Sequence, residues 1–431
     1  HPNESQIRPM HVVLLNQAFH PDVVATAQMA KDLADRLVAR GHTVSVVASR
    51  SIYGKSGATL PKRETIDGIH VYRVGASRFG KKSIAARAFD FGLFYVRAAL
   101  RTLTLKKPDV VVCFTTPPFI TLVGILTRLF RRSKCVCWLM DMYPDVAVAS
   151  GVMKPSSMPT RFFNALNRWL LRRADVTVVL GRCMQSLVLD KGAPEDRVKF
   201  IPVWADTTGI EPVRRAENPY REKFDTAESF CVMYSGNWGI AHDYETICDG
   251  MRRVVTVPPR DDKGRAIPVR FVFVGAGKRR ELVEAYIKEY KLEKDATYYD
   301  YVPRADIGLS LGAADVHLMT VKEGMEGMIV PSKLFGVMAA GKPSLYVGSP
   351  ESEIARIITE TASGMCFAEG DSAGLAEAIR SLASDSIGRK RMGKNARDAL
   401  VGQYDADTLC ARWIDMLEEL TRKRGSGKSK S

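Results

Sequence analysis

The 431-residue sequence lacks any uninterrupted apolar run that approaches the ~18 residues of a membrane-spanning helix. Its first residues, HPNESQIRP, contain no apolar stretch of the kind found in secretory signal peptides. The dinucleotide-binding fingerprint GxGxxG is also missing from the first predicted strand–helix turn, where Val23, Val24 and Ala25 stand. We therefore expect neither a membrane-spanning protein nor one secreted by a signal peptide, and a nicotinamide or flavin site in this turn is disfavoured.

Closely spaced cysteines are scarce as well. Most of the eight cysteines lie in apolar runs, and only Cys135 and Cys137 are near each other, as CxC in a predicted strand. Such side chains are typical of packed core thiols in a reducing compartment rather than of metal ligands or disulfides. We therefore expect a cytoplasmic protein whose cysteines bind no metal. The cysteines are Cys113, Cys135, Cys137, Cys183, Cys231, Cys248, Cys366 and Cys410.

A strand–helix alternation begins at residues 11–15, HVVLL. An amphipathic helix pattern follows and ends at Gly41, and TVSVVAS at 43–49 predicts a second strand. This βαβ beginning predicts a doubly wound parallel sheet. Further strands of the first domain are predicted at 69–74, 109–114, 135–140 and 176–180.

The pattern restarts after a charged, turn-rich segment at 206–229, which we interpret as a linker. The predicted fold class is α/β, with two tandem Rossmann-like domains at 10–205 and 230–405 that face a cleft. Open α/β sheets bind ligands at the carboxyl ends of their strands, so a ligand is expected there. A closing helix at 406–424 and a disordered tail at 425–431 complete the prediction. The strands predicted in the second domain are 231–235, 269–274, 315–320 and 344–347.

Positive charge is concentrated in the first half of the chain. Residues 1–208 carry twice as many basic as acidic side chains, whereas the numbers are equal in 209–431, so the net +15 belongs to the first half. Residues 78–107 contain one acid, Asp90, among many basic and apolar side chains, and PPFITLVGILTRLFRR and RFFNALNRWLLRR repeat this pattern. Basic amphipathic helices of this kind typically lie on anionic membranes. The alternative is an ordinary core face with solvated arginines.

Nucleic acid is the other anionic partner that such charge can bind. Here the aromatic side chains stand among aliphatic ones rather than on a polar sheet face, which disfavours stacking on bases. The prediction is an anionic membrane surface and no nucleic acid.

The stretch from Met325 to Gly348 joins a polar turn to an apolar helix and a short strand. Pro331 suits the first position of a helix, and Ser332 and Lys333 follow in its first turn. Free backbone N–H groups, the helix dipole, a hydroxyl and an ammonium together suit a diphosphate. The alternative is an ordinary turn with a capping serine.

Four motifs occur in a characteristic order along the chain: FHPD followed by LADRLVARGHTVSVV, then CVCWLMDMYPD, YSGNWGIAHD and PSKLFGVMAAGKP. In this order the chain resembles the family-4 retaining glycosyltransferases of the GT-B fold. Within that family it resembles the subgroup that builds bacterial exopolysaccharides, colanic acid and O-antigens, including amino-sugar transferases. The resemblance covers roughly residues 10–420.

The resemblance implies a nucleotide-sugar donor in the second domain and an acceptor in the first. It implies catalytic roles for Asp141, beside the reacting sugar, and for Glu326. An alternative for Asp141 is a helix-capping aspartate. Residues His20, Asp22 and Thr26 are implied on the acceptor side. The implied donor-binding residues are Ser235, Gly236, Asn237, Gly239, Gly275, Gly277, Lys278, Val302, Met328, Ser332 and Lys333.

The chain departs from the family pattern at several of these positions. The two glutamates that relatives place eight positions apart would fall at Met328 and Gly336, and Glu326 is the substitute that we select, with Glu323 behind it. Asn237 and Asp243 stand where relatives carry Arg and Lys. Donor phosphate charge would then fall on backbone amides and on Lys333, with further candidates in Lys278, Arg279 and Arg280.

The function implied is transfer of a sugar, with retention of configuration, to a lipid-linked (polyprenyl diphosphate) saccharide in bacterial surface polysaccharide synthesis. The enzyme is expected on the inner face of the cell membrane as a peripheral protein. No cofactor or metal is expected, because no DxD-type acidic pair stands in the predicted cleft loops. Two alternatives remain at this point: a nucleotide-sugar 2-epimerase of the same fold, and a non-catalytic subunit of a polysaccharide machine.

Overall fold

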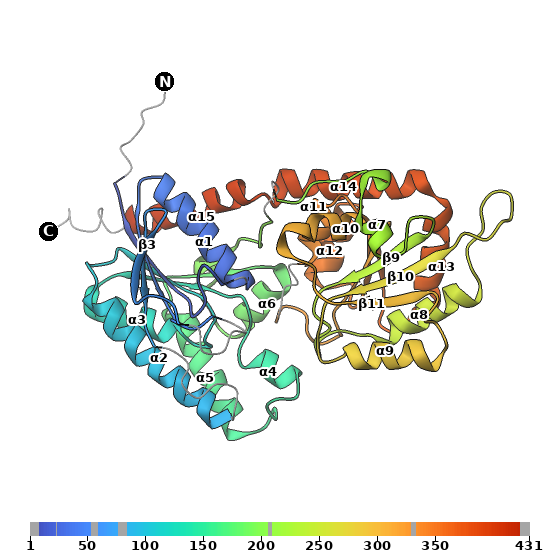
Figure 1. Cartoon of the computed structure of the whole chain (residues 1–431). Coiled ribbons are helices and arrows are strands. Elements are labelled where there is room, and N and C mark those ends of the chain that lie inside the picture. Colours follow the sequence, from blue (N-terminus) through green and yellow to red (C-terminus); the bar gives the residue numbers. More distant parts are fainter. Residues whose placement is uncertain are drawn as a thin grey trace. The chain divides into compact units, whose positions relative to one another are not determined.

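The computed structural model of the chain describes residues 8–22, 24–52, 59–75, 84–205, 209–328 and 333–422, with the backbone alone at 84–89 and 304. The chain forms two compact units (Figure 1). Unit 1 contains the described residues of His1–Val148, Met153–Val203 and Asp407–Ser431, and unit 2 contains those of Ala149–Val152 and Trp204–Ala406. Each unit is built around a β-sheet with helices packed on it, as the alternating sequence pattern predicts.

Unit 1 holds an eight-stranded sheet in the order β3-β4-β2-β1-β5-β6-β7-β8, in which β3 alone is antiparallel to its neighbour. Its central strands are short runs of β-branched and other apolar residues that are buried on both faces, as in β5, VVVC. The six strands predicted in this domain are all present, whereas β3 and β8 were missed. The strands are β1 His11–Leu15, β2 Thr43–Ala48, β3 Arg63–Ile66, β4 Ile69–Arg73, β5 Val110–Cys113, β6 Lys134–Trp138, β7 Val176–Val179 and β8 Val198–Phe200.

The C-terminal helix α15 (Ala406–Arg422) belongs to the packing of unit 1. Trp413 is fully buried, and its ring lies 4.2 Å from that of Trp138 between centroids. Glu418 accepts a hydrogen bond from His42 Nε2 at 3.1 Å, within a buried contact. The helix predicted at the end of the chain therefore completes the core of the first unit. The other helices of unit 1 are α1 Ala25–Ala39, α2 Ile84–Thr104, α3 Thr121–Arg131, α4 Asp145–Ala149, α5 Met158–Arg173, α6 Arg182–Asp190 and the 3₁₀ helix Glu195–Arg197.

Unit 2 holds a six-stranded parallel sheet in the order β11-β10-β9-β12-β13-β14. The four predicted strands are present, and β11 and β14 were missed. The strands are β9 Phe230–Ser235, β10 Val269–Val274, β11 Ala296–Tyr299, β12 Val316–Thr320, β13 Ser344–Val347 and β14 Gly364–Phe367. The helices are α7 Tyr220–Lys223, α8 Glu245–Thr256, α9 Arg280–Glu289, α10 Ile307–Gly312, α11 Lys333–Ala339, α12 Glu353–Glu360, α13 Ser372–Ser384, α14 Ser386–Gln403 and the 3₁₀ helices Arg215–Glu217 and Arg304–Asp306.

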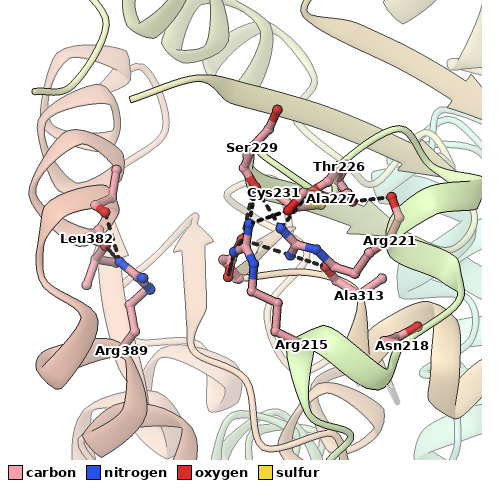
Figure 2. Close-up of polar contacts among 12 residues, drawn as sticks. Arg215, Asn218, Arg221, Thr226, Ala227, Ser229, Cys231, Ala313, Leu382 and Arg389 are labelled. Atoms are coloured by element: carbon pink, nitrogen blue, oxygen red, sulfur yellow. Dashed lines mark hydrogen bonds and ion pairs between the residues drawn. The ribbon is translucent and has the colours of Figure 1, made fainter. Parts of the chain in front are cut away.

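The interpretation of 206–229 as a linker is wrong for residues 209–229, which pack into unit 2. Tyr220 and Phe224 are buried in an apolar cluster against β10. The buried guanidinium of Arg221 donates hydrogen bonds to the carbonyl oxygens of Ala313, Thr226 and Ser229 (Figure 2) and is paired with Asp315 at 2.9 Å. A buried charge must be paired and hydrogen-bonded to be tolerated, and both terminal nitrogens of Arg221 are, so this segment is a structural part of the unit.

Strand order fixes where a ligand site of unit 2 is expected. From β9 the chain moves outward through β10 and β11, and it then returns to the other side of β9 with β12. This reversal is a topological switch point, where open parallel sheets bind ligands beyond the carboxyl ends of their strands. The loops after β9, β10 and β12 all leave the sheet at that edge.

Candidate functional site

The three loops at the switch point of unit 2 are tied to one another by backbone hydrogen bonds. The amide of Trp238 after β9 donates to the carbonyl of Ala276 after β10 at 2.7 Å, and Lys322 after β12 donates to Ala241 at 2.9 Å. Glycines allow this close approach: a Cβ on Gly277 would lie 2.6 Å from the Trp238 nitrogen, and one on Gly275 would lie 2.9 Å from the Gly236 carbonyl carbon. These glycines therefore allow the loops to pack against each other, a structural role that is separate from any contact with a ligand.

Lys333, the first residue of α11, reaches across to the loop after β9. Its ammonium donates hydrogen bonds to the hydroxyl of Tyr234 at 2.6 Å and to the carbonyl oxygen of Asn237 at 3.1 Å. The nitrogen also lies 4.6 Å from the centre of the Tyr234 ring. Burial lowers the pKa of Lys333 to about 7, because the ammonium loses water and no carboxylate of the described residues compensates. A bound anion would raise the pKa of Lys333 again and keep its ammonium charged.

Gly236 lies directly under the Lys333 side chain. Its φ of +136° is disfavoured for residues with a side chain, and a Cβ there would lie 3.0 Å from the lysine nitrogen. The predicted donor residues Gly236, Asn237 and Lys333 are therefore brought together by the structure. Ser332 lies outside the described residues, so the predicted serine contact stays a prediction.

His242 and Asp243 end the same loop, before α8. His242 Nδ1 donates to the carbonyl oxygen of Thr320 at 2.6 Å. Burial, with the charge of Lys333 as a second cause, lowers the pKa of His242 to about 4, so the ring is neutral at pH 7. Asp243 accepts hydrogen bonds from the amides of Glu245 and Thr246 and so satisfies two backbone donors in the first turn of α8.

The other predicted residues of the donor site make contacts within their own turns or with nearby elements. Glu326 accepts from the amide of Gly324 at 2.8 Å, within its own turn, and Met328 ends the described part of that turn. Lys278 is exposed, while Val302 packs partly buried against the apolar cluster beside β10. Arg280, one of the further candidates for phosphate charge, is paired with Glu284 at 2.9 Å and with Asp300.

Unit 1 gathers its predicted residues at the carboxyl ends of β1, β5 and β6, which are neighbours in its sheet. The amide of Asp141, after β6, donates to the hydroxyl of Thr115 after β5 at 3.3 Å. Burial raises the pKa of Asp141 to about 6. The helix that follows begins at Asp145, so Asp141 does not occupy its N-cap position and the capping alternative is wrong.

The acceptor-side residues lie in the loop between β1 and α1. The carbonyl of His20 accepts from the buried Arg73 at 2.6 Å, and Asp22 is buried and accepts from the amide of Val24 at 3.3 Å. Thr26 stands in the first turn of α1. These contacts fix the loop at the same sheet edge as Asp141.

The sequence of both units matches known domains. Residues 25–204 match the glycosyl transferase 4-like domain, and residues 253–399 match the glycosyl transferases group 1 domain. A probable glycosyltransferase WbjE from Pseudomonas aeruginosa is 31% identical over 297 residues, which are 68% of this chain and 70% of that protein. The chain belongs to the family-4 glycosyltransferases. It is therefore a transferase, and the matches give no support to an epimerase or a non-catalytic subunit.

A second relative agrees with this assignment, and a solved structure shares the fold. The putative colanic acid biosynthesis glycosyl transferase WcaI of Escherichia coli is 21% identical over 81% of this chain and 86% of its own. The solved structure of Anabaena Alr3699/HepE in complex with UDP and glucose is 16% identical, covers 95% of this chain and 100% of its own, and has a TM-score of 0.69. The GT-B fold that the motifs predicted is thus confirmed.

Three side chains of this site were missed from the sequence. Tyr234, Trp238 and His242 form a buried aromatic group around the Lys333 contact, with the Tyr234 and Trp238 rings stacked at 3.8 Å. Aromatic residues beside the glycine-rich YSGNWG turn are the signal that was available. Among the described residues, no group of three or more His, Cys, Asp or Glu side chains is placed to hold a metal ion. Metal-free transfer stays a prediction.

Proposed function

We propose that this glycosyltransferase takes a sugar from a nucleoside diphosphate donor and transfers it, with retention of configuration, to a lipid-linked saccharide. The observation that carries the donor assignment is the Lys333 ammonium, held by Tyr234 and Asn237 over Gly236 at the switch point of the sheet. A diphosphate placed there would meet a preorganised cation in partly dry surroundings, where electrostatic interactions are stronger than in water. The solved HepE complexes with UDP and with UDP-glucose support this choice of ligand class.

The chemistry follows from the charge that develops in the reaction. As the glycosidic bond breaks, negative charge grows on the leaving diphosphate, and Lys333 with loop amides stabilises it without reorganisation. Positive charge grows on the reacting sugar at the same time. The Asp141 carboxylate is the proposed partner of that charge, as the family resemblance implies, and at pH 7 most of it is ionised because its pKa is about 6.

The lipid-linked acceptor is supported by the surface of unit 1 formed by α2, α3 and α5, which we call the basic apolar face. Helix α3 packs against both α2 and α5. Large apolar side chains stand exposed on all three helices; Phe130 is 72% exposed and Phe162 63%. Exposed apolar side chains gathered on neighbouring helices support a docking surface here. The exposed apolar residues are Val96 and Leu100 on α2, Leu126, Leu129 and Phe130 on α3, and Met158, Phe162 and Trp169 on α5.

Exposed basic residues flank these apolar side chains. On α5, Arg161, Arg168 and Arg172 stand beside Phe162 and Trp169, and Arg132 follows Phe130. Each basic residue near an anionic bilayer contributes about 1 kcal/mol, and the apolar side chains insert between headgroups. One side of helix α2 is core, because Phe94 and Ala98 are buried there, so the ordinary core interpretation holds for that side. None of the described helices is long and apolar enough to cross a membrane.

A role in surface polysaccharide synthesis is supported by the relative WcaI, a putative colanic acid biosynthesis glycosyl transferase. The proposed enzyme would work at the inner face of the cell membrane, where a polyprenyl diphosphate saccharide and a soluble nucleotide sugar are both accessible.

A ligand screen and a transfer assay test the proposal in sequence. Thermal shifts with UDP-, GDP-, ADP- and dTDP-glucose identify the nucleobase, because at equal concentration the ligand that binds more tightly raises the melting temperature more. The best donor is then incubated with polyprenyl diphosphate saccharides, and the anomeric configuration of the product is read by NMR. Stabilisation by one nucleotide sugar and a retained configuration are expected. An inverted product refutes the retaining mechanism, and the lack of any stabilisation refutes the donor class.

A further inference from the structure

Tyr234 is a buried tyrosine whose hydroxyl bonds to the candidate donor lysine. It is the next-to-last residue of β9, and its side chain is 1% exposed. The hydroxyl accepts from Lys333 Nζ at 2.6 Å and donates to the Asn237 carbonyl at 3.1 Å. The same carbonyl accepts directly from Lys333 at 3.1 Å, so the three groups form a closed triangle.

This triangle fixes the direction of the lysine. An ammonium has three N–H donors, and the contacts with Tyr234 and Asn237 account for two of them. The third remains available to a ligand. A lysine on its own is a flexible point charge that loses considerable rotamer freedom when it is held in one geometry, so holding it beforehand reduces the entropy lost on binding.

Tyr234 is itself held rigidly. Trp238 stacks on its ring with centroids 3.8 Å apart and an angle of 20° between the planes, and His242 meets both rings edge-on. The hydroxyl therefore has little freedom to follow the lysine elsewhere.

We propose that Tyr234 is a positioning residue, which holds the Lys333 ammonium ready for the diphosphate of the donor. The inference rests on the proposed function, because it needs a diphosphate ligand at this site. It adds a residue that acts through Lys333 and touches no ligand itself.

Phenylalanine at position 234 separates this role from packing. It keeps the ring, the stacking on Trp238 and the ring's contact with the ammonium, and it removes only the hydroxyl. We expect Tyr234→Phe to weaken binding of the nucleotide sugar found in the screen about fivefold at pH 7, the effect of one ordinary hydrogen bond.

A pH profile supplies a readout that packing alone would not move. Among the described residues, Tyr234 and His242 are titratable groups that interact with Lys333. The pKa of Tyr234 is raised far above 10 by burial and that of His242 is lowered to about 4, so Lys333 is the one group among these that titrates between pH 6 and 9. Loss of the hydroxyl removes an acceptor for the charged form. The pH at which donor affinity begins to fall should therefore move lower, by about half a unit.

The chain offers a matched control in unit 2. Lys223 donates to the hydroxyl of Tyr220 at 3.2 Å and lies over its ring at 4.4 Å, so Tyr220→Phe removes the same kind of contact in α7, outside the switch-point loops. Tyr220 is also buried and bonded to Asp306, so its variant measures the structural effect of losing a buried hydroxyl. Donor affinity should be unchanged in Tyr220→Phe.

The deciding experiment is a calorimetric double-mutant cycle with Tyr234→Phe, Lys333→Met and their combination, with thermal unfolding recorded for each variant. If Tyr234 acts through Lys333, its substitution has no further effect once Lys333 is methionine. Additive losses, or a Tyr234→Phe variant that binds like the parent, would overturn the inference while Lys333→Met still supports the donor site. A parent protein that binds none of the nucleotide sugars would instead refute the proposed function, and the role of Tyr234 with it.

Discussion

Gly236 and Lys333, which are far apart in the sequence, compete for one small volume: a Cβ on Gly236 would lie 3.0 Å from the lysine Nζ. The glycine also has a φ of +136°, which a side chain disfavours. We predict that Gly236→Ala displaces the ammonium from Tyr234 and weakens nucleotide-sugar binding roughly tenfold or more, on the scale of a lost hydrogen bond to a charged group. Calorimetry measures this.

The control for this prediction is Gly402→Ala, because a Cβ there meets open space and its position in α14 is helical. Affinity equal to the parent in Gly236→Ala would show that the lysine can bind a donor from another position.

Donor affinity should depend on pH through Lys333. The pKa of this lysine in the free protein is about 7, and a bound diphosphate raises it because the charged form is favoured. Affinity is therefore highest below pH 7 and falls as the pH rises from 7 to 9, by up to about tenfold per unit. A nucleotide sugar is the right probe, since its diphosphate does not titrate in this range. The arginine side chain stays charged, so Lys333→Arg should give a flat profile, and a flat profile in the parent would contradict the assignment.

Asp141 should affect turnover more than donor binding. We predict that Asp141→Asn lowers kcat strongly with little change in donor Kd, because a carboxylate that stabilises developing charge acts on the transition state. In the parent, kcat should rise with pH through about 6 as the carboxylate ionises. Normal turnover in a folded variant would exclude a catalytic role.

The same carboxylate should cost stability at neutral pH. Its pKa is about 6 when folded against an ordinary 3.8, so its contribution is fully favourable below pH 3.8 and is lost as the pH rises through 6. Compared with the parent, the Asp141→Asn variant should therefore gain free energy of unfolding at pH 8 but not at pH 4. The difference between the two pH values should be roughly 1–3 kcal/mol. Denaturant unfolding at the two pH values checks this, and an equal effect at both would contradict the raised pKa.

Much of this fold follows from local sequence pattern, and the site follows from it only in part. The central strands were found because they are short apolar runs buried on both faces, as in VVVC. The missed strands β3 and β8 are sheet edges with exposed positions, and β14 is a half-buried edge that begins with glycine. The segment 209–229 looked like a linker because its charges are visible in the sequence, whereas the partners that bury Arg221 are not.

At the site, the glycines and Lys333 were identified from motifs. The bond between Lys333 and Tyr234 joins residues 99 positions apart, and no periodicity or spacing reports such a contact.

The basic apolar face should bind vesicles that contain anionic lipid. We predict that the parent pellets with phosphatidylglycerol vesicles and not with phosphatidylcholine ones, and that binding weakens with salt because exposed charges are screened over ~8 Å at physiological ionic strength. Changing Arg161, Arg168 and Arg172 to glutamate should release the protein. The matched control reverses Lys288, Lys291 and Lys294, which are exposed in unit 2, with the same change in net charge. Equal loss of pelleting in both variants would mean that net charge, rather than this face, binds the membrane.

Transfer of a labelled sugar from its nucleoside diphosphate to a polyprenyl diphosphate saccharide is the decisive assay of the proposed function. The label is followed into the organic-soluble product, with the parent and with Lys333→Ala under the same conditions. We predict label in the lipid fraction with the parent, and a rate roughly 10- to 150-fold lower in the variant, which corresponds to about 1.5–3 kcal/mol for a hydrogen bond to a charged group. Label that stays water-soluble although the nucleotide sugar binds, or an undiminished rate in Lys333→Ala, would contradict it.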